Sequence, residues 1–188
     1  MYQHTRLSTN RLGFFQKFRN FDYILLLCIL LLGFISLATM YSTDGGEVKF
    51  HTKSHFTKLV VFTLMMLVFS FVNIKYWFSI GYLAYVVIIG LLIWTYLFGI
   101  TSSGSQRWIN LYFINLQPSE LMKIFIIVCL AKFFHRKKLE NVNSLYTILT
   151  SLIIILLPMG LVMVQPDLGT AVLIAISGIA VLWFAGTN

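Results

Sequence analysis

The stretch at residues 104–123, GSQRWINLYFINLQPSELMK, is a polar passage between two strongly apolar segments of the chain. It contains an Arg-Trp pair, a Gln-Pro pair that is typical of a helix start, and Glu120 and Lys123 three residues apart. Ionisable residues at membrane depth are rare and usually face a bundle interior or a wet cavity. If the flanking segments cross a bilayer, this passage is the first candidate for a functional site.

The composition is that of an integral membrane protein. Of 188 residues, 59% are hydrophobic and 11% are charged, and the mean hydropathy is +0.85, which lies outside the soluble globular range. The net charge of +8 does not indicate nucleic-acid binding, because the basic residues gather at the ends of apolar runs. Cys28 and Cys129 lie inside apolar runs, so no disulfide framework is predicted.

The apolar runs predict an all-α fold, a polytopic transmembrane helix bundle of about six spans. Each run approaches the roughly 20 residues that a spanning helix needs. We divide the chain into a basic N-terminal segment, residues 1–22, and a transmembrane bundle, residues 23–188. For the first segment, an interfacial helix with Phe14, Phe18 and Phe21 on one face and a disordered tail both fit the pattern. The predicted spans are residues 23–41, 56–72, 77–100, 118–134, 145–164 and 168–185.

The distribution of basic residues predicts a cytoplasmic N-terminus. With this orientation nine Lys and Arg residues face the cytoplasm and four face outward, which agrees with the positive-inside rule. The passage at 104–120 and the tripeptide at 165–167 then lie on the non-cytoplasmic side. The nine are Arg6, Arg11, Lys17, Arg19, Lys75, Lys132, Arg136, Lys137 and Lys138, and the four are Lys49, Lys53, Lys58 and Arg107.

The fourth predicted span starts with a polar face. Pro118 suits the first helical position, and Glu120 then falls in the first turn, where the helix dipole favours it. Gln117, Glu120 and Lys123 share one side of this helix near its outer end. They form either the polar wall of a substrate cavity or an ion pair within the helix that makes two buried charges tolerable.

Two further groups lie on the same side of the membrane. Arg107 and Trp108 either anchor the loop at the headgroup level or give Arg107 a phosphate to bind, with Lys123 as a second contact. Gln165-Pro166-Asp167 repeats the Gln-Pro helix start. Asp167 either interacts with the helix dipole or pairs with Arg107 or Lys123. His51 and His55 are four apart, but no neighbouring residue completes a metal site, and none is predicted.

Three motifs together resemble the SEDS family of bacterial cell-wall proteins. They are GSQRWI at 104–109, QPSELMK at 117–123 and QPDLGTA at 165–171, and their order and spacing match over the whole chain. Together with Tyr41-Ser42, the wording of the second motif is most similar to the rod-shape-determining RodA branch, as opposed to the division protein FtsW. All three motifs begin on the predicted non-cytoplasmic side.

This resemblance implies a multi-pass glycosyltransferase of the bacterial inner (cytoplasmic) membrane. Such enzymes polymerise lipid II, the undecaprenyl-pyrophosphate-linked precursor, for cell-wall elongation and rod shape, beside a class B penicillin-binding protein and membrane lipids. No cofactor is evident, and a divalent cation is compatible with pyrophosphate chemistry. Cations would stabilise the charge that develops on this leaving group. Carried over by motif, the candidate substrate-binding residues are Arg107, Trp108, Gln117, Glu120, Lys123, Gln165 and Asp167.

The resemblance also implies what this sequence lacks. Family members have about ten spans, and their catalytic aspartate lies in a large outer loop of the second half, within a His-Thr-Asp-Phe-like motif that is not found here. We therefore expect an N-terminal half with no catalytic residue of its own, inactive alone. Two alternatives remain open, a flippase for lipid-linked precursors and a non-catalytic remnant or scaffold.

Overall fold

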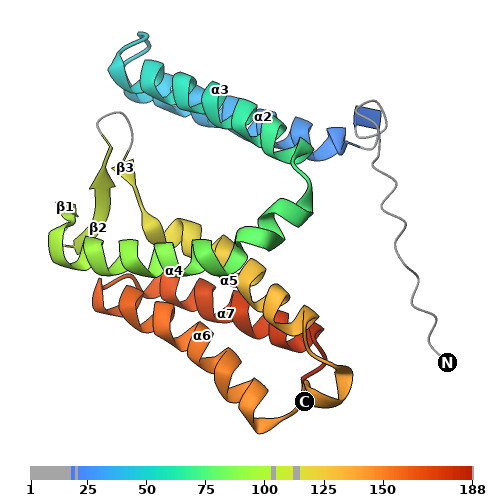
Figure 1. Ribbon diagram of the computed structural model, residues 1–188. Helices are drawn as coiled ribbons and strands as arrows, with labels where there is room; N and C mark the ends of the chain where they lie inside the picture. The colour runs from blue at the N-terminus through green and yellow to red at the C-terminus, as the bar shows by residue number, and fades with distance from the viewer. Residues whose placement is uncertain (1–17, 20, 103–104, 112–114, 188) are drawn as a thin grey trace. The chain divides into compact units, whose positions relative to one another are not determined.

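Six α-helices occur in the computed structural model, which describes residues 18–19, 21–102, 105–111 and 115–187 (Figure 1). The polytopic helical architecture predicted from the sequence is confirmed. Four helices, α2, α3, α4 and α6, are long and apolar enough to cross a membrane, whereas α5 carries three charged residues and α7 has 17 residues. The helices are α2 (Tyr23–Thr43), α3 (Phe50–Phe71), α4 (Ile74–Phe98), α5 (Pro118–His135), α6 (Leu145–Val164) and α7 (Leu168–Phe184).

The observed helix ends agree with the predicted spans to within a few residues, except at α3. This helix begins at Phe50, whereas the sequence analysis placed its start at residue 56. The additional turns contain His51, Lys53 and His55, which are polar enough to interrupt an apolar run but do not disfavour helix. Most of the predicted N-terminal segment, including Phe14, lies outside the described residues.

The chain divides into two compact units, residues 1–72 and 73–188. In the first, α2 and α3 form a hairpin whose turn is held by Asp44. Its carboxylate accepts hydrogen bonds from the backbone N–H of Thr52 at 2.9 Å and from the Thr52 hydroxyl at 2.6 Å. Lys49, the N-cap of α3, makes no side-chain capping bond. Asp44 therefore supplies the acceptor that the first turn of α3 lacks.

The second unit combines α4 to α7 with a small sheet that the sequence analysis did not predict. The passage after α4 forms three antiparallel strands in the order β1, β2, β3. Ile100 lies opposite Trp108, and Ile109 lies opposite Leu116. The last strand leads directly into α5, so the sheet connects the end of α4 to the start of α5. Its strands are β1 (Ile100–Ser102), β2 (Ser105–Asn110) and β3 (Asn115–Leu116), and a short 3-10 helix, η1 (Leu139–Asn141), follows α5.

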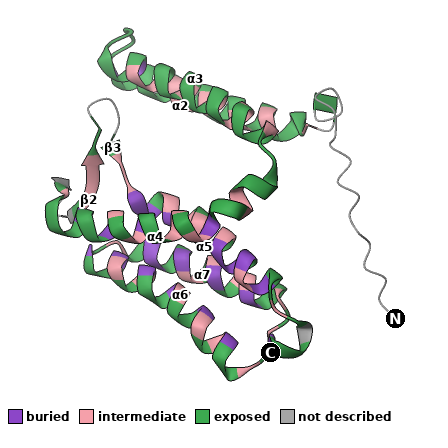
Figure 2. Cartoon of the chain, viewed as in Figure 1, coloured by how far each residue is buried: buried purple, intermediate pink, exposed green. Residues whose placement is uncertain are grey.

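The core of the second unit lies between its four helices, where Figure 2 shows the buried residues gathered. At Gly178, an added Cβ would lie 2.5 Å from Cγ1 of Ile155. The absence of a side chain at Gly178 therefore allows a close approach between α7 and α6. Fully buried side chains from the four helices include Leu92, Met122, Ile126, Leu130, Ile155, Val162, Ala171 and Ile174.

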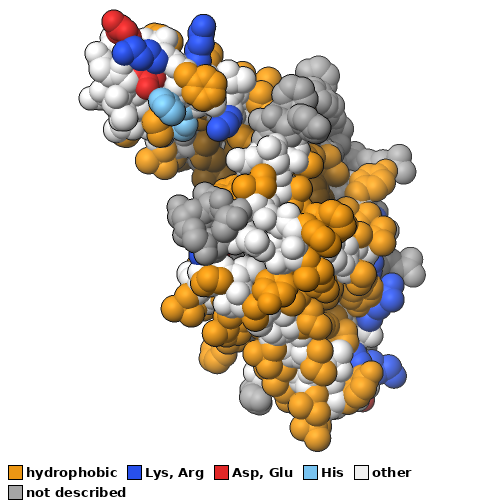
Figure 3. All heavy atoms as spheres, turned by 90° about the vertical axis from the view of Figure 1, so that its left-hand side faces the viewer, with side chains coloured by type: hydrophobic (Ala, Val, Ile, Leu, Met, Phe, Trp, Pro, Cys, Tyr) orange, Lys and Arg blue, Asp and Glu red, His pale blue; other side chains and the backbone are white. Residues whose placement is uncertain are grey.

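The outward faces of the helices are apolar. Ile24, Trp183 and Phe184 are 76%, 77% and 87% exposed, and hydrophobic side chains cover much of the face in Figure 3. Apolar surface on this scale is incompatible with water and suits a hydrocarbon environment. The chain is a multi-pass membrane protein.

Candidate functional site

Three segments of the second unit meet at the carboxylate of Asp167, the N-cap of α7. Its Oδ1 accepts the backbone N–H of Thr170 at 3.3 Å. Its Oδ2 lies 3.5 Å from Nη1 of Arg107 on β2 and accepts the amide of Gln117, the N-cap of α5, at 3.1 Å. We call Arg107, Gln117 and Asp167 the Asp167 cluster. It joins the sheet, the start of α5 and the start of α7.

Arg107 makes more than an ion pair. Its Nε donates to the carbonyl of Gln165 at 3.0 Å, and its Nη2 donates to the carbonyl of Pro166. An arginine has five N–H donors, so these contacts leave some of them available. The predicted pairing of Asp167 with Arg107 is confirmed, and the guanidinium also holds the link between α6 and α7 in place.

Glu120 and Lys123 form an ion pair of their own, within the first two turns of α5. Nζ of Lys123 lies 2.8 Å from Oε1 of Glu120, and the two side chains are 26% and 54% exposed. Exposed pairs of this kind contribute about 1 kcal/mol or less to stability. The helix start agrees with the prediction, with Pro118 in the first turn and Glu120 beside the N-terminal dipole. Lys123 retains two N–H donors for another acceptor.

Gln165 is buried, and its side chain is directed toward α4. Its Nε2 donates to the carbonyl of Leu92 at 2.9 Å and lies 3.2 Å from the hydroxyl of Thr95. Only its backbone carbonyl reaches Arg107. The sequence analysis grouped Gln165 with the substrate-binding residues and did not single out Thr95, a hydroxyl near the end of an apolar span. The structure instead connects Gln165 to the interior of the bundle.

The remaining predicted residue, Trp108, is half-buried on β2. The tripeptide at 165–167 was expected to start a helix at its proline. In the structure α7 begins at Leu168, and Pro166 precedes the N-cap residue Asp167. Within the described residues there is no cluster of three or more His, Cys, Asp or Glu side chains that could hold a metal ion. The candidate residues thus form two groups, the Asp167 cluster and the Glu120–Lys123 ion pair.

Residues 19–188 match the FtsW/RodA/SpoVE family, described as "Cell cycle protein". A probable peptidoglycan glycosyltransferase FtsW of Buchnera aphidicola subsp. Baizongia pistaciae is 32% identical over 167 residues, which are 86% of this chain and 44% of the relative. The peptidoglycan glycosyltransferase MrdB of Escherichia coli K12 is 30% identical over 181 residues, 96% of this chain and 48% of the relative. The chain thus spans about half the length of these relatives.

Solved structures share the fold. The rod shape determining protein RodA of Thermus thermophilus superposes with a TM-score of 0.78 at 21% identity, covering 90% of this chain and 55% of that one. A chain from a peptidoglycan synthase complex, described as coordinating polymerization and crosslinking, gives the same TM-score over 89% of this chain and 48% of its own. The family resemblance seen in the three motifs is confirmed.

Proposed function

The chain belongs to the FtsW/RodA/SpoVE family of the bacterial cytoplasmic membrane, and on this basis we propose that it contributes to a peptidoglycan glycosyltransferase that polymerises lipid II. To this half we assign the binding of the pyrophosphate group of the precursor. Two relatives, each about twice as long, bear the name peptidoglycan glycosyltransferase. Growth of the wall during elongation and rod-shape maintenance is the corresponding cellular role.

The observation that carries this proposal is the pairing of each candidate cation with a carboxylate. Arg107 is held by Asp167, and Lys123 is held by Glu120. Each cation keeps N–H donors that its partner does not use. Such an arrangement fixes one positive charge in the middle of β2 and another in the second turn of α5, and each cation can still donate hydrogen bonds, which is what a diphosphate ligand requires.

The chemistry follows from the leaving group. When the bond between the sugar and the pyrophosphate oxygen breaks, negative charge grows on the pyrophosphate. Cations stabilise that charge most when they are already oriented toward it before the reaction, because no reorganisation is then needed. Gln117 and Asp167 would orient Arg107, and Glu120 would orient Lys123. We assign no general base to these residues, and a divalent cation would be compatible with the two carboxylates.

The proposed partner is a class B penicillin-binding protein, which would crosslink the strands that the polymerase makes. Support comes from the fold shared with a chain of a peptidoglycan synthase complex. The substrate would be lipid II, whose isoprenoid chain matches the apolar outer faces of the helices.

The test uses the complete protein with its penicillin-binding partner and fluorescent lipid II. Lys123→Gln and Arg107→Lys should lower both precursor binding and polymer length, because each removes or reshapes a phosphate contact. Lys75→Gln is the matched control. Lys75 is exposed and lies at the N-terminal end of α4, whereas the sheet follows the C-terminal end of that helix. Translocation of lipid II without polymer would contradict the proposal, and so would wild-type binding and polymerisation by both site variants.

A cellular test separates catalysis from scaffolding. Arg107→Ala and Asp167→Ala should abolish rod shape when each variant replaces the wild-type protein at equal membrane abundance. A non-catalytic scaffold would tolerate both changes. Normal cell shape with either variant would therefore favour the scaffold over the polymerase.

A further inference from the structure

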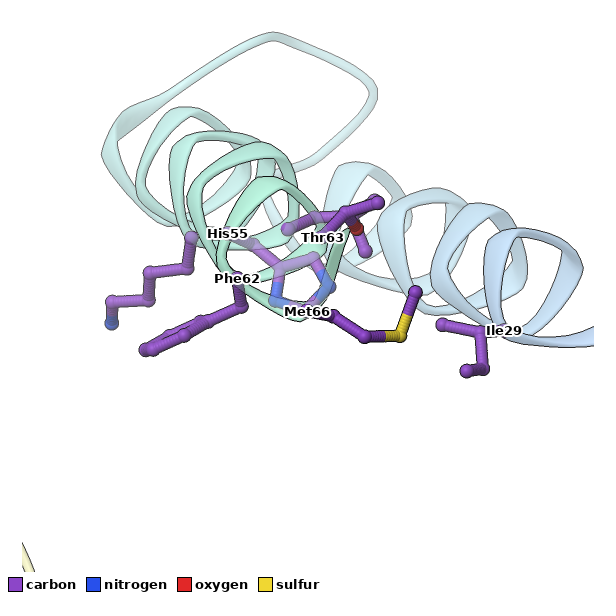
Figure 4. Close-up of a pocket in the computed structure, with 7 residues that line it drawn as sticks. Ile29, His55, Phe62, Thr63 and Met66 are labelled. Atoms are coloured by element: carbon purple, nitrogen blue, oxygen red, sulfur yellow. The ribbon is translucent and has the colours of Figure 1, made fainter. Parts of the chain in front are cut away.

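A groove runs along α3 on the side that meets α2, within the first unit. It has a volume of about 480 Å³, in the range of ligand pockets. Figure 4 shows His55, Phe62 and Met66 projecting from α3 to the same side, with Ile29 of α2 beyond the end of Met66. The lining residues are Ile29, His55, Lys58, Leu59, Phe62, Thr63 and Met66.

The lining is graded from polar to apolar along the helix. His55 and Lys58 come first, and Phe62 and Met66 follow one and two turns later. At 1.5 Å per residue, Lys58 and Met66 are about 12 Å apart along α3. A cationic end followed by an apolar trough is the shape complement of an amphiphile with an anionic head group.

The polar end of the groove has an unmet hydrogen-bonding atom. Nε2 of His55 is buried and has no hydrogen-bond partner among the described residues. Whichever protonation state it takes, a buried polar atom without a partner is unfavourable. A ligand oxygen that reaches this position would accept a hydrogen bond from the Nε2–H group of His55.

The charge balance of the hairpin favours an anion. Within the described residues of this unit the acids are already engaged: Asp22 caps α2, Asp44 accepts from Thr52, and Glu47 pairs with Lys49. No acid lies in α3, whose first nine residues include His51, Lys53, His55 and Lys58. Lys58 has no ion pair with any described acid.

We propose that this groove binds one anionic phospholipid of the outer leaflet. Its phosphate would lie between Lys58 and His55, and one acyl chain would follow Phe62 and Met66 toward Ile29. A small water-soluble anion would leave the apolar half of the groove unused, and a zwitterionic lipid such as phosphatidylcholine would bring its own cation beside the phosphate and so attract Lys58 less strongly. A lysine that reaches a lipid phosphate in this way follows the usual behaviour of basic residues near a membrane surface.

The experiment measures lipid retention by native mass spectrometry of the full-length protein in detergent. Dioleoyl-phosphatidylglycerol and dioleoyl-phosphatidylcholine are titrated separately, so the two probes differ only in the head group. We expect one tightly retained phosphatidylglycerol, held by the wild-type protein more strongly than phosphatidylcholine. Equal retention of the two lipids would overturn the proposal.

Three variants locate the site. Lys58→Gln should weaken phosphatidylglycerol binding roughly fivefold, whereas Lys53→Gln, an exposed lysine of the same helix outside the groove, should leave it unchanged. Met66→Trp should fill the trough and reduce retention of both lipids. Equal effects of the two lysine variants would overturn the proposal, because they would indicate only diffuse attraction to the basic end of α3.

A further arm decides between lipid sources. Undecaprenyl phosphate shares the anionic head and the apolar tail but has an isoprenoid chain. Tighter binding of this carrier than of phosphatidylglycerol, with the same dependence on Lys58, would overturn the assignment to a phospholipid. Helix content by circular dichroism and a single gel-filtration peak check folding, and His55→Gln provides a second head-group variant if Lys58→Gln does not fold.

Discussion

The hydroxyl group of Tyr85 on α4 donates a 2.9 Å hydrogen bond to the backbone carbonyl of Ile154 on α6. Pro158 lies four residues after Ile154, inside α6, and proline has no N–H to donate. The carbonyl of Ile154 is therefore the one that this proline leaves without a helical donor. Because the bilayer core offers no water to replace it, the tyrosine on the neighbouring helix satisfies it.

Tyr85→Phe should destabilise the protein by about 1 kcal/mol, the usual size of a hydrogen bond between transmembrane helices. Pro158→Ala restores the N–H that proline lacks, so the same tyrosine change should cost less in that background. A double-mutant cycle, with unfolding followed in mixed detergent micelles, measures the difference. Equal costs in the two backgrounds would refute the coupling.

Asp167→Asn keeps an oxygen that can cap α7 but removes the charge opposite Arg107. We expect a loss of about 1 to 3 kcal/mol, because the partly buried guanidinium loses its counter-charge. Exchanging the two residues, Arg107→Asp with Asp167→Arg, should not restore stability. Arg107 also donates to the carbonyls of Gln165 and Pro166, which the exchanged aspartate cannot do. Full recovery in the exchanged protein would show that the ion pair alone matters.

Gln165→Leu preserves approximate size and removes both hydrogen bonds to α4. Stability should fall by about 1 to 2 kcal/mol, while the precursor affinity of the folded fraction stays at the wild-type level, because this side chain faces the interior. Gln117→Leu is the comparison, since its amide contacts Asp167. Calorimetric titration with a lipid II analogue, beside thermal unfolding, separates the two effects. If Gln165→Leu bound the precursor more weakly than the wild-type protein, Gln165 would again count as a substrate-binding residue.

Exchanging Glu120 and Lys123 tests the second ion pair. The exchanged helix can still form an (i, i+3) pair, so stability should change by less than about 1 kcal/mol. The cation, however, moves to the first turn of α5, where the helix dipole disfavours it. Precursor affinity should fall several-fold if Lys123 binds pyrophosphate. Wild-type affinity in the exchanged protein, measured by the same titration, would exclude that role.

The Asp44 turn should make the hairpin sensitive to acid. The hydroxyl of Thr52 and then its backbone N–H, with smaller contributions from His51 and Lys49, hold the pKa of Asp44 below its ordinary value of 3.8. The ionised carboxylate therefore stabilises the fold at pH values above that ordinary value, and this contribution is lost as the pH falls through the lowered pKa.

Asp44→Asn provides the measurement. At neutral pH the wild-type protein should unfold at a higher temperature than the variant, and the two midpoints should converge as the pH falls toward the lowered pKa. Glu47→Gln is the control, because that side chain is 73% exposed and forms an exposed ion pair with Lys49. A difference between wild type and Asp44→Asn that does not change with pH would contradict the assigned role of the charge.

The helices could be predicted because apolar length is itself the physical requirement for crossing a bilayer. The early start of α3 was missed because His51 and Lys53 interrupt the apolar run without breaking the helix. The sheet was missed because β1 and β3, with three and two residues, are too short to show a hydrophobic period, and the six residues of β2, SQRWIN, do not alternate between apolar and polar. Their pairing depends on contacts across the loop, which a local pattern does not contain.

The candidate site divides in the same way. The partner of Asp167 could be anticipated, because two Gln-Pro helix starts and an arginine were expected on one side of the membrane. The direction of the Gln165 side chain could not be anticipated, because it depends on where the packing of α4 places Thr95. Lys132 was counted among the cytoplasmic charges, yet it is 7% exposed and donates to the carbonyl of Ser79. Its place against α4 is also set by packing.

The three charges of α5 have a consequence for how the protein is made. An ionisable residue opposes the insertion of a lone helix by about 3 kcal/mol at the helix centre, and by less at the positions of Glu120, Lys123 and Lys132, which lie in the first two turns and the last turn of α5. With α4 already in the bilayer, Lys132 finds the Ser79 carbonyl and the ring of Tyr82, 4.8 Å away. We therefore expect α5 to enter the membrane together with α4. Fused alone behind a translocation reporter, α5 should insert poorly, and the α4–α5 pair should insert well.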